Sequence, residues 1–150
     1  MLPLNTPVNT PPAFGWRAAA GLLVLGMLFG LFVLGAQPFA VNLVPSPLDK
    51  LAHVAAFAVL ACAIGLLSGQ RGRRMLLIAV AGALLIGVLD EWHQMFLPGR
   101  HAGPDDLAMD VIGSLLGAIL LTRWRLHTAR AVQRAGGQQI MNSDRNVKHH

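Results

Sequence analysis

The chain has 150 residues, of which 54% are hydrophobic and only 13% are charged. Soluble globular domains carry roughly 25% charged residues, so this composition excludes an ordinary soluble domain and indicates a membrane protein. The net charge is +5 and the pI about 11.1, but the basic residues gather beside apolar runs. We therefore interpret them as topology signals and expect no nucleic-acid partner.

Four apolar runs are visible, at residues 18–36, 51–67, 75–89 and 107–122. The last two are shorter than the roughly 20 residues that span a bilayer, but each becomes long enough if the adjoining polar turn is also helical. The sequence therefore predicts an all-α polytopic membrane protein with four transmembrane helices. We expect a flexible N-terminal segment at 1–15, a four-helix membrane domain at 16–124, and a basic, partly disordered cytoplasmic tail at 125–150.

The first run has an alternative interpretation as a secretory signal. Arg17 precedes it, and the stretch "LGAQPFA" that ends it contains small residues, as cleavage sites do. The run is longer than a signal core, which has roughly 7–15 apolar residues. A retained transmembrane helix is therefore favoured.

Arginines predict the orientation of the helices. They lie at Arg17, in the loop at 69–74 and after the fourth apolar run, whereas only Lys50 and Arg100 fall on the other side. The positive-inside rule then puts both termini in the cytoplasm. The loops at 37–47 and 98–104 are predicted to face outward.

Negative charge gathers on the predicted outer side. Of the seven acidic residues, six fall there: Asp49, Asp90, Glu91, Asp105, Asp106 and Asp110. Lys50 and Arg100 are too few to neutralise them. Asp49 and Asp105 also have a structural interpretation, because each follows a proline that indicates a helix start, where the helix dipole favours acidic residues.

Three polar side chains are expected at similar depth on three different helices. His53 and Asp110 each lie six residues after a proline that indicates a helix start, which is roughly 9 Å along a helix. Asp90 lies near the outer end of the third helix. An ionised residue in a membrane segment costs on the order of 2.5–3.5 kcal/mol, so such residues are expected to face inward and to mark a site.

Spacing of four residues supports an inward-facing arrangement. The pairs Gly26 with Gly30 and Gly113 with Gly117 predict close packing between helices. The same spacing puts Gln94 on the helix face of Asp90. The prediction is a polar pocket that opens outward and is floored by packed helices.

Two kinds of chemistry fit such a pocket. In metal-free acid/base catalysis, the catalytic residues would be His53, which titrates near neutrality, with Asp90 and Glu91. Arg100 would hold a phosphate bidentately. The full set assigned to substrate binding is Asp49, Lys50, Gln94, Arg100, Asp106 and Asp110.

A divalent metal is the second chemical hypothesis. One histidine and several carboxylates could hold Mg²⁺, Ca²⁺ or Mn²⁺, but no HExxH motif is present and the metal ligands stay unassigned. A non-catalytic alternative is that the polar groups only hold the helices together, with Arg100 and Lys50 pairing with Asp90 or Asp106. A transporter or flippase-like protein is a further alternative, although internal repeats are absent.

Three ordered motifs resemble those of the VanZ-like family of small bacterial membrane proteins. They are "DKLAHVAAF", "DEWHQMFLPGR" and "DLAMDVIGSLLG", within residues 40–120. Many members have Asn where this chain has Asp110. The resemblance implies a multi-pass protein of the bacterial cytoplasmic (inner) membrane and a link to the cell envelope, since the founding member is associated with low-level resistance to the glycopeptide teicoplanin.

Together, these features predict an integral membrane protein whose outward-facing pocket binds or processes a cell-envelope molecule. Arg100, as a group that could hold a phosphate, leads us to expect an anionic, lipid-linked molecule. Its expected partners are membrane lipids and a lipid-linked envelope precursor.

Overall fold

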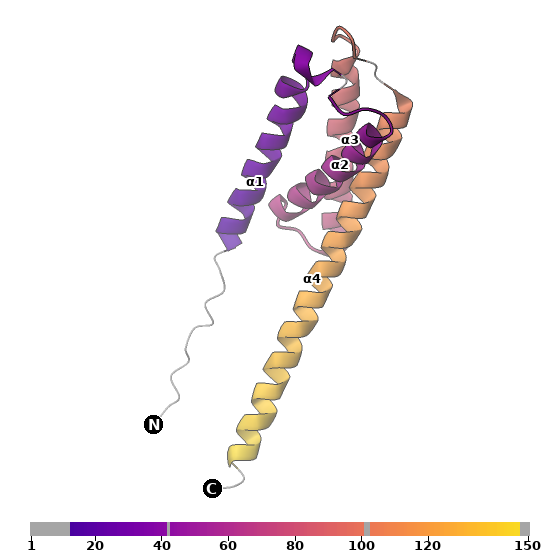
Figure 1. Ribbon diagram of the computed structural model, residues 1–150. Coiled ribbons are helices and arrows are strands. Elements are labelled where there is room, and N and C mark those ends of the chain that lie inside the picture. The colour runs from indigo at the N-terminus through magenta and orange to yellow at the C-terminus, as the bar shows by residue number, and fades with distance from the viewer. Residues whose placement is uncertain (1–12, 42, 101–102, 148–150) are drawn as a thin grey trace.

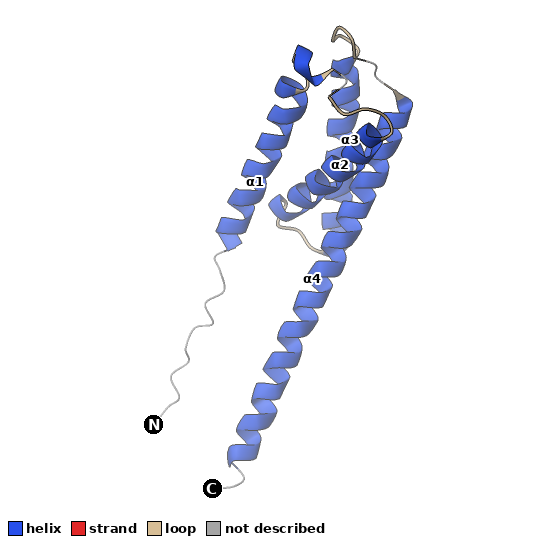
Figure 2. Cartoon of the chain, in the orientation of Figure 1, coloured by secondary structure: helices blue, strands red, loops and turns tan. Residues whose placement is uncertain are grey.

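The computed structural model describes residues 13–41, 43–100 and 103–147. Most of the predicted flexible N-terminal segment and the last three residues of the predicted tail lie outside the described residues. The described part contains helices and loops and no strand (Figure 2). Its elements are α1 (Ala13–Phe29), η1 (Gly30–Leu34), η2 (Pro38–Ala40), α2 (Leu48–Leu67), α3 (Gly72–Gln94) and α4 (Pro104–Val147).

Four helices are long and apolar enough to cross a membrane, which confirms the predicted all-helical, four-span fold. The spans are Gly15–Leu34, Leu48–Leu67, Gly72–Gln94 and Pro104–Gln138. The third and fourth exceed their apolar runs because the adjoining polar turns are helical. The start of α1 and the end of α4 lie at the same end of the bundle (Figure 1), and the side of the membrane on which this end lies stays a prediction.

The closest helix packing joins α2 to α4. A Cβ atom at Gly117 would overlap the backbone carbonyl of Ala58, and one at Gly113 would overlap that of Val54. The predicted packing of this glycine pair is therefore confirmed, and it holds the N-terminal halves of the two helices together.

The same prediction for Gly26 and Gly30 is wrong, because no atom lies within 4 Å of a Cβ placed at either residue. Helix α1 and the following turn η1 instead pack on the bundle through larger apolar side chains, among them Val24 and Met27 of α1 and Leu31 of η1. Glycines at this spacing permit close packing only where a second helix covers them.

A Gly117→Ala variant is expected to lose about 1–3 kcal/mol of stability, because the added methyl group would force α4 away from α2. Thermal denaturation in detergent, followed by circular dichroism, measures the effect. Gly26→Ala is the matched control and is expected to leave the melting temperature unchanged or slightly higher, because its added methyl group meets open space and alanine favours the helix. Equal melting temperatures for the two variants would contradict this account of the packing.

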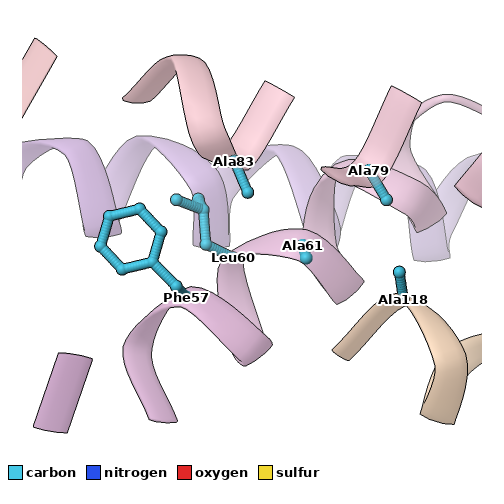
Figure 3. Packing of buried hydrophobic residues seen from close by; sticks show 6 residues of the cluster. All are labelled: Phe57, Leu60, Ala61, Ala79, Ala83 and Ala118. Atoms are coloured by element: carbon cyan, nitrogen blue, oxygen red, sulfur yellow. The ribbon is translucent and has the colours of Figure 1, made fainter. Parts of the chain in front are cut away.

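A compact apolar core lies next to the end of the bundle that carries the predicted site residues. It consists of Phe57, Leu60, Ala61, Ala79, Ala83 and Ala118 (Figure 3). The alanines let α2, α3 and α4 approach closely, and the larger Phe57 and Leu60 fill the space between them. The core therefore forms a floor beneath the predicted site.

Helix α4 continues beyond the bundle to Val147 and includes much of the segment predicted as a basic tail. Two arginines bind backbone carbonyls at the end of α2 and in the loop that joins it to α3. Arg17 Nε donates to the carbonyl of Leu67 at 3.2 Å, and Arg125 Nη1 donates to the carbonyl of Gln70 at 2.7 Å. These two basic residues thus also satisfy exposed carbonyls at and after the end of α2.

Candidate functional site

A partly open cavity of about 490 Å³ lies where α1 ends and where α2 and α4 begin. Five of the predicted site residues line it: Asp49, His53, Gln94, Arg100 and Asp106. The rest of its wall is mainly apolar and comes from the end of α1 and the segment that follows. The cavity thus combines a polar wall with an apolar one.

His53 of α2 and Asp110 of α4 form the central pair of the site. Nδ1 of His53 lies 2.8 Å from Oδ1 of Asp110, and Asp110 is completely buried while 21% of the His53 side chain is exposed. The close approach of α2 and α4 at Gly113 brings the two side chains within reach. Because Asp110 occupies Nδ1, the remaining ring nitrogen, Nε2, is the one available to the cavity.

Phe57 supports the imidazole from below. Its ring is nearly parallel to that of His53, with a 6° angle between the planes and 6.3 Å between the centroids. Phe57 belongs to the buried core, so the histidine is held between a rigid apolar floor and a buried carboxylate. This arrangement limits its rotation and fixes the direction of Nε2.

Asp90 of α3 forms a second pair, with Gln94. Its Oδ2 accepts a hydrogen bond from Gln94 Nε2 at 2.8 Å, and Asp90 is only 1% exposed. The other oxygen, Oδ1, is buried without a hydrogen-bond partner. In the part of the chain that the structure describes, no hydrogen bond joins Asp90 to His53 or Asp110.

Helix α3 comes close to the central pair at Gly87. A Cβ at this position would lie 2.8 Å from Oδ2 of Asp110, so glycine leaves the space that the carboxylate needs. His53, Asp90 and Asp110 therefore lie at one end of the bundle, as expected, but they form two separate hydrogen-bonded pairs. His53 of the first pair and Gln94 of the second line the cavity.

Lys50 has an ion-pairing position. Its Nζ pairs with Asp105 and Asp106 and lies 3.9 Å from Oδ2 of Asp49, which ties the start of α2 to the start of α4. Lys50 does not line the cavity. The contact with Asp106 agrees with the hypothesis that Lys50 stabilises the helix arrangement.

Glu91 is also away from the cavity wall. Its Oε2 accepts a hydrogen bond from the backbone N–H of Gly103 at 2.8 Å, immediately before α4 begins. The carboxylate thus fixes the end of the loop between α3 and α4. This geometry favours a positioning role for Glu91 over the catalytic role predicted from sequence.

Arg100 lies in the cavity wall and ties the α3–α4 loop to α1. Its Nε and Nη2 both donate to the carbonyl of Gly35, at 3.2 and 2.6 Å, just after the π-helical turn η1. No carboxylate among the described residues lies within ion-pairing distance of Arg100, so the hypothesised pairing with Asp90 is not present. Three of the five N–H groups of the guanidinium remain available.

Sequence reasoning missed the apolar part of the wall. Leu34, Phe39, Leu43 and Val44 line the cavity, and Phe39 and Leu43 are 63% and 66% exposed. Large apolar residues in a loop predicted to face water were the available signal, because exposed apolar groups that gather in one place mark an interaction site.

The buried polar groups end within the half of the bundle that contains the cavity. Ser114 lies one helical turn below Asp110, is fully buried, and has no hydrogen-bond partner. Below it the described residues form the apolar core around Leu60 and Ala118. Among these described residues, no three His, Cys, Asp or Glu side chains are placed to hold a metal ion.

The chain matches a known protein family. The family model described as VanZ/LLP1 matches residues 10–125, a range that includes every residue of the site described above. No curated protein and no solved structure matches the chain.

Proposed function

This chain belongs to the VanZ/LLP1 family, and on that premise we propose that its cavity binds the phosphate-bearing head group of a cell-envelope lipid. In this proposal the protein is a multi-pass protein of the bacterial cytoplasmic membrane, and the cavity opens at the outer leaflet. Binding of an envelope precursor at this site would provide the link to glycopeptide tolerance that the family resemblance implies.

Arg100 is the observation that carries the proposal. It lines the cavity, its position is fixed by two hydrogen bonds to the carbonyl of Gly35, and its charge has no carboxylate partner among the described residues. A guanidinium held in this way is suited to a phosphate, because its planar N–H groups match two phosphate oxygens. His53 Nε2 is a second group that could hydrogen-bond the same phosphate.

The apolar wall favours a lipid over a soluble phosphate. Leu34, Phe39 and Leu43 line the cavity beside the polar residues, so a ligand with a charged head and an apolar continuation would satisfy both walls. The volume of about 490 Å³ lies within the roughly 300–1,000 Å³ of ligand pockets.

Lipid retention tests the proposal. Wild-type protein purified with native lipid is expected to retain a phosphate-bearing lipid in native mass spectrometry, and Arg100→Gln is expected to bind it about 10- to 100-fold more weakly, because hydrogen bonds to charged groups contribute about 1.5–3 kcal/mol. Arg73→Gln is the matched control, because Arg73 is an exposed arginine at the start of α3, and the cavity lies at the other end of that helix. Equal retention by both variants would rule out this site.

The pair of His53 and Asp110 favours a second candidate function, hydrolysis of a lipid diphosphate. His53 Nε2 would accept a proton from water, whose oxygen attacks the terminal phosphorus, and the bond to the bridging oxygen would break to release phosphate. Water is the nucleophile in this candidate because Cys62 lies away from the cavity, where its Sγ donates to the carbonyl of Gly117 at 3.1 Å.

The transporter alternative receives less support. Among the described residues, the fully buried polar side chains stop at Ser114, and the core beneath it, which includes Leu60 and Ala118, is apolar and completely buried. A polar substrate moving across the bundle would have to pass this core, which costs more than entering and leaving the cavity from one side.

A further inference from the structure

Two opposite charges in the cavity wall are not paired with each other. The Asp49 carboxylate accepts a hydrogen bond from the backbone N–H of Lys50 at 2.8 Å, and its nearest cation is Lys50 Nζ at 3.9 Å. Arg100 is bonded to a neutral carbonyl. Lys50 itself is bound mainly to Asp105 and Asp106. The cavity therefore presents a carboxylate and a guanidinium that both remain available to a ligand.

Negative charge exceeds positive charge at this end of the bundle. Six acidic residues lie there against two permanent cations, Arg100 and Lys50, and Lys50 is already paired with Asp105 and Asp106. Behind the wall lie Asp90 and Asp110, which are at least 99% buried, and each has one oxygen without a hydrogen-bond partner. A ligand that carried only a phosphate would satisfy Arg100 and increase this excess of negative charge. A ligand that also carried a cation would leave the excess unchanged and would give Asp49 a charged partner.

We propose, building on the lipid-binding function above, that the head group carries a primary ammonium beside its phosphate, as phosphoethanolamine does. The phosphate binds Arg100 and the ammonium binds Asp49. Gln94 supplies a further acceptor, because its Nε2 donates to Asp90 and its carbonyl oxygen is thereby left to the cavity that Gln94 lines.

The number of acceptors distinguishes a primary from a quaternary ammonium. A primary ammonium has three N–H donors. The cavity offers it the carboxylate of Asp49, the carbonyl of Gln94 and the carboxylate of Asp106, whose Oδ1 is bound by Lys50. A quaternary ammonium has no N–H donor and is bound instead by aromatic cages. Phe39 is the one aromatic residue among those that line the cavity, so such a cage is absent there.

Native mass spectrometry of the full chain in detergent tests the inference. The probes are phosphatidylethanolamine, phosphatidylglycerol and phosphatidylcholine with identical acyl chains. Wild type is expected to bind phosphatidylethanolamine about 10-fold more tightly than either other lipid, and Asp49→Asn is expected to remove this preference without weakening phosphatidylglycerol, because only the ammonium contact is lost. Soluble phosphoethanolamine is expected to compete only at much higher concentration, because it lacks the chains that would contact Phe39 and Leu43.

Asp105→Asn is the matched control, since it removes the same charge from the same end of the bundle at a residue that does not line the cavity. It is expected to keep the preference for phosphatidylethanolamine. Equal binding of the three lipids by wild type, or an unchanged preference in Asp49→Asn, would overturn the inference. The proposed function would still stand in that case if Arg100→Gln weakened all three lipids, and it would fail if Arg100→Gln weakened none.

Discussion

An Asp90→Asn variant is expected to melt at or above the temperature of the wild-type protein while it binds the head group about 3- to 10-fold more weakly. The stability follows from burial. Asp90 is 1% exposed, one of its oxygens has no hydrogen-bond partner, and a buried carboxylate with a single hydrogen bond is costly. Asparagine has the same shape without the charge, so it removes this cost.

The weaker binding follows from the hydrogen bond to Gln94. A carboxylate can only accept, so Asp90 fixes the amide of Gln94 with its N–H₂ group inward and its carbonyl available to the cavity. Asparagine both donates and accepts, and it would let the Gln94 amide turn over. The change in affinity therefore measures the orientation of the Gln94 amide, on which the stability of the protein does not depend.

Thermal denaturation and lipid titration of the same preparation measure both effects. Asp105→Asn is again the control, because it removes a carboxylate from an exposed ion pair, a type of interaction that contributes only about 0–1 kcal/mol. If Asp90→Asn melted several degrees lower and bound lipid normally, the pair of Asp90 and Gln94 would serve to hold the helices together and its role in binding would be refuted.

The sequence predicts the depth of the polar residues well, because depth depends only on helix starts and on the rise per residue. The prolines before α2 and α4 place His53 and Asp110 one to two turns inside the bundle. The glycine pair in α4 predicts its close approach to α2 correctly. Both predictions depend on the positions of prolines or glycines within one helix, and such local patterns can be read from the sequence.

The partners of these residues are less predictable, because they depend on how each helix is rotated and on contacts between distant segments. His53 pairs with Asp110 while Asp90 pairs with Gln94, yet the spacing allows other combinations. Arg100 bonds the carbonyl of Gly35, 65 residues away, and a backbone carbonyl leaves no signal in the sequence. Gly26 fails as a packing position for the same reason, since the motif does not reveal whether a neighbouring helix covers it.

Asp110→Asn is expected to separate the two candidate functions most sharply. If the site hydrolyses a lipid diphosphate, the variant should release phosphate about 100- to 10,000-fold more slowly than wild type, which is the usual contribution of general acid–base catalysis. Asparagine can still accept the hydrogen bond from His53 Nδ1, so the ring keeps its direction. It lacks the negative charge that stabilises the imidazolium formed when His53 takes a proton from water.

Phosphate release from undecaprenyl diphosphate in detergent micelles, measured together with lipid affinity by native mass spectrometry, provides the two readouts. Affinity is expected to change less than about threefold, because Arg100, which does not touch Asp110, makes the main contact with the diphosphate. His93→Gln is the matched control: it removes a histidine at the same end of the bundle whose ring packs against Phe32, outside the cavity wall. Loss of turnover with retained affinity in Asp110→Asn alone would establish that the pair of His53 and Asp110 is catalytic, whereas a wild-type protein that binds the lipid and releases no phosphate would exclude hydrolysis and leave binding as the function of the cavity.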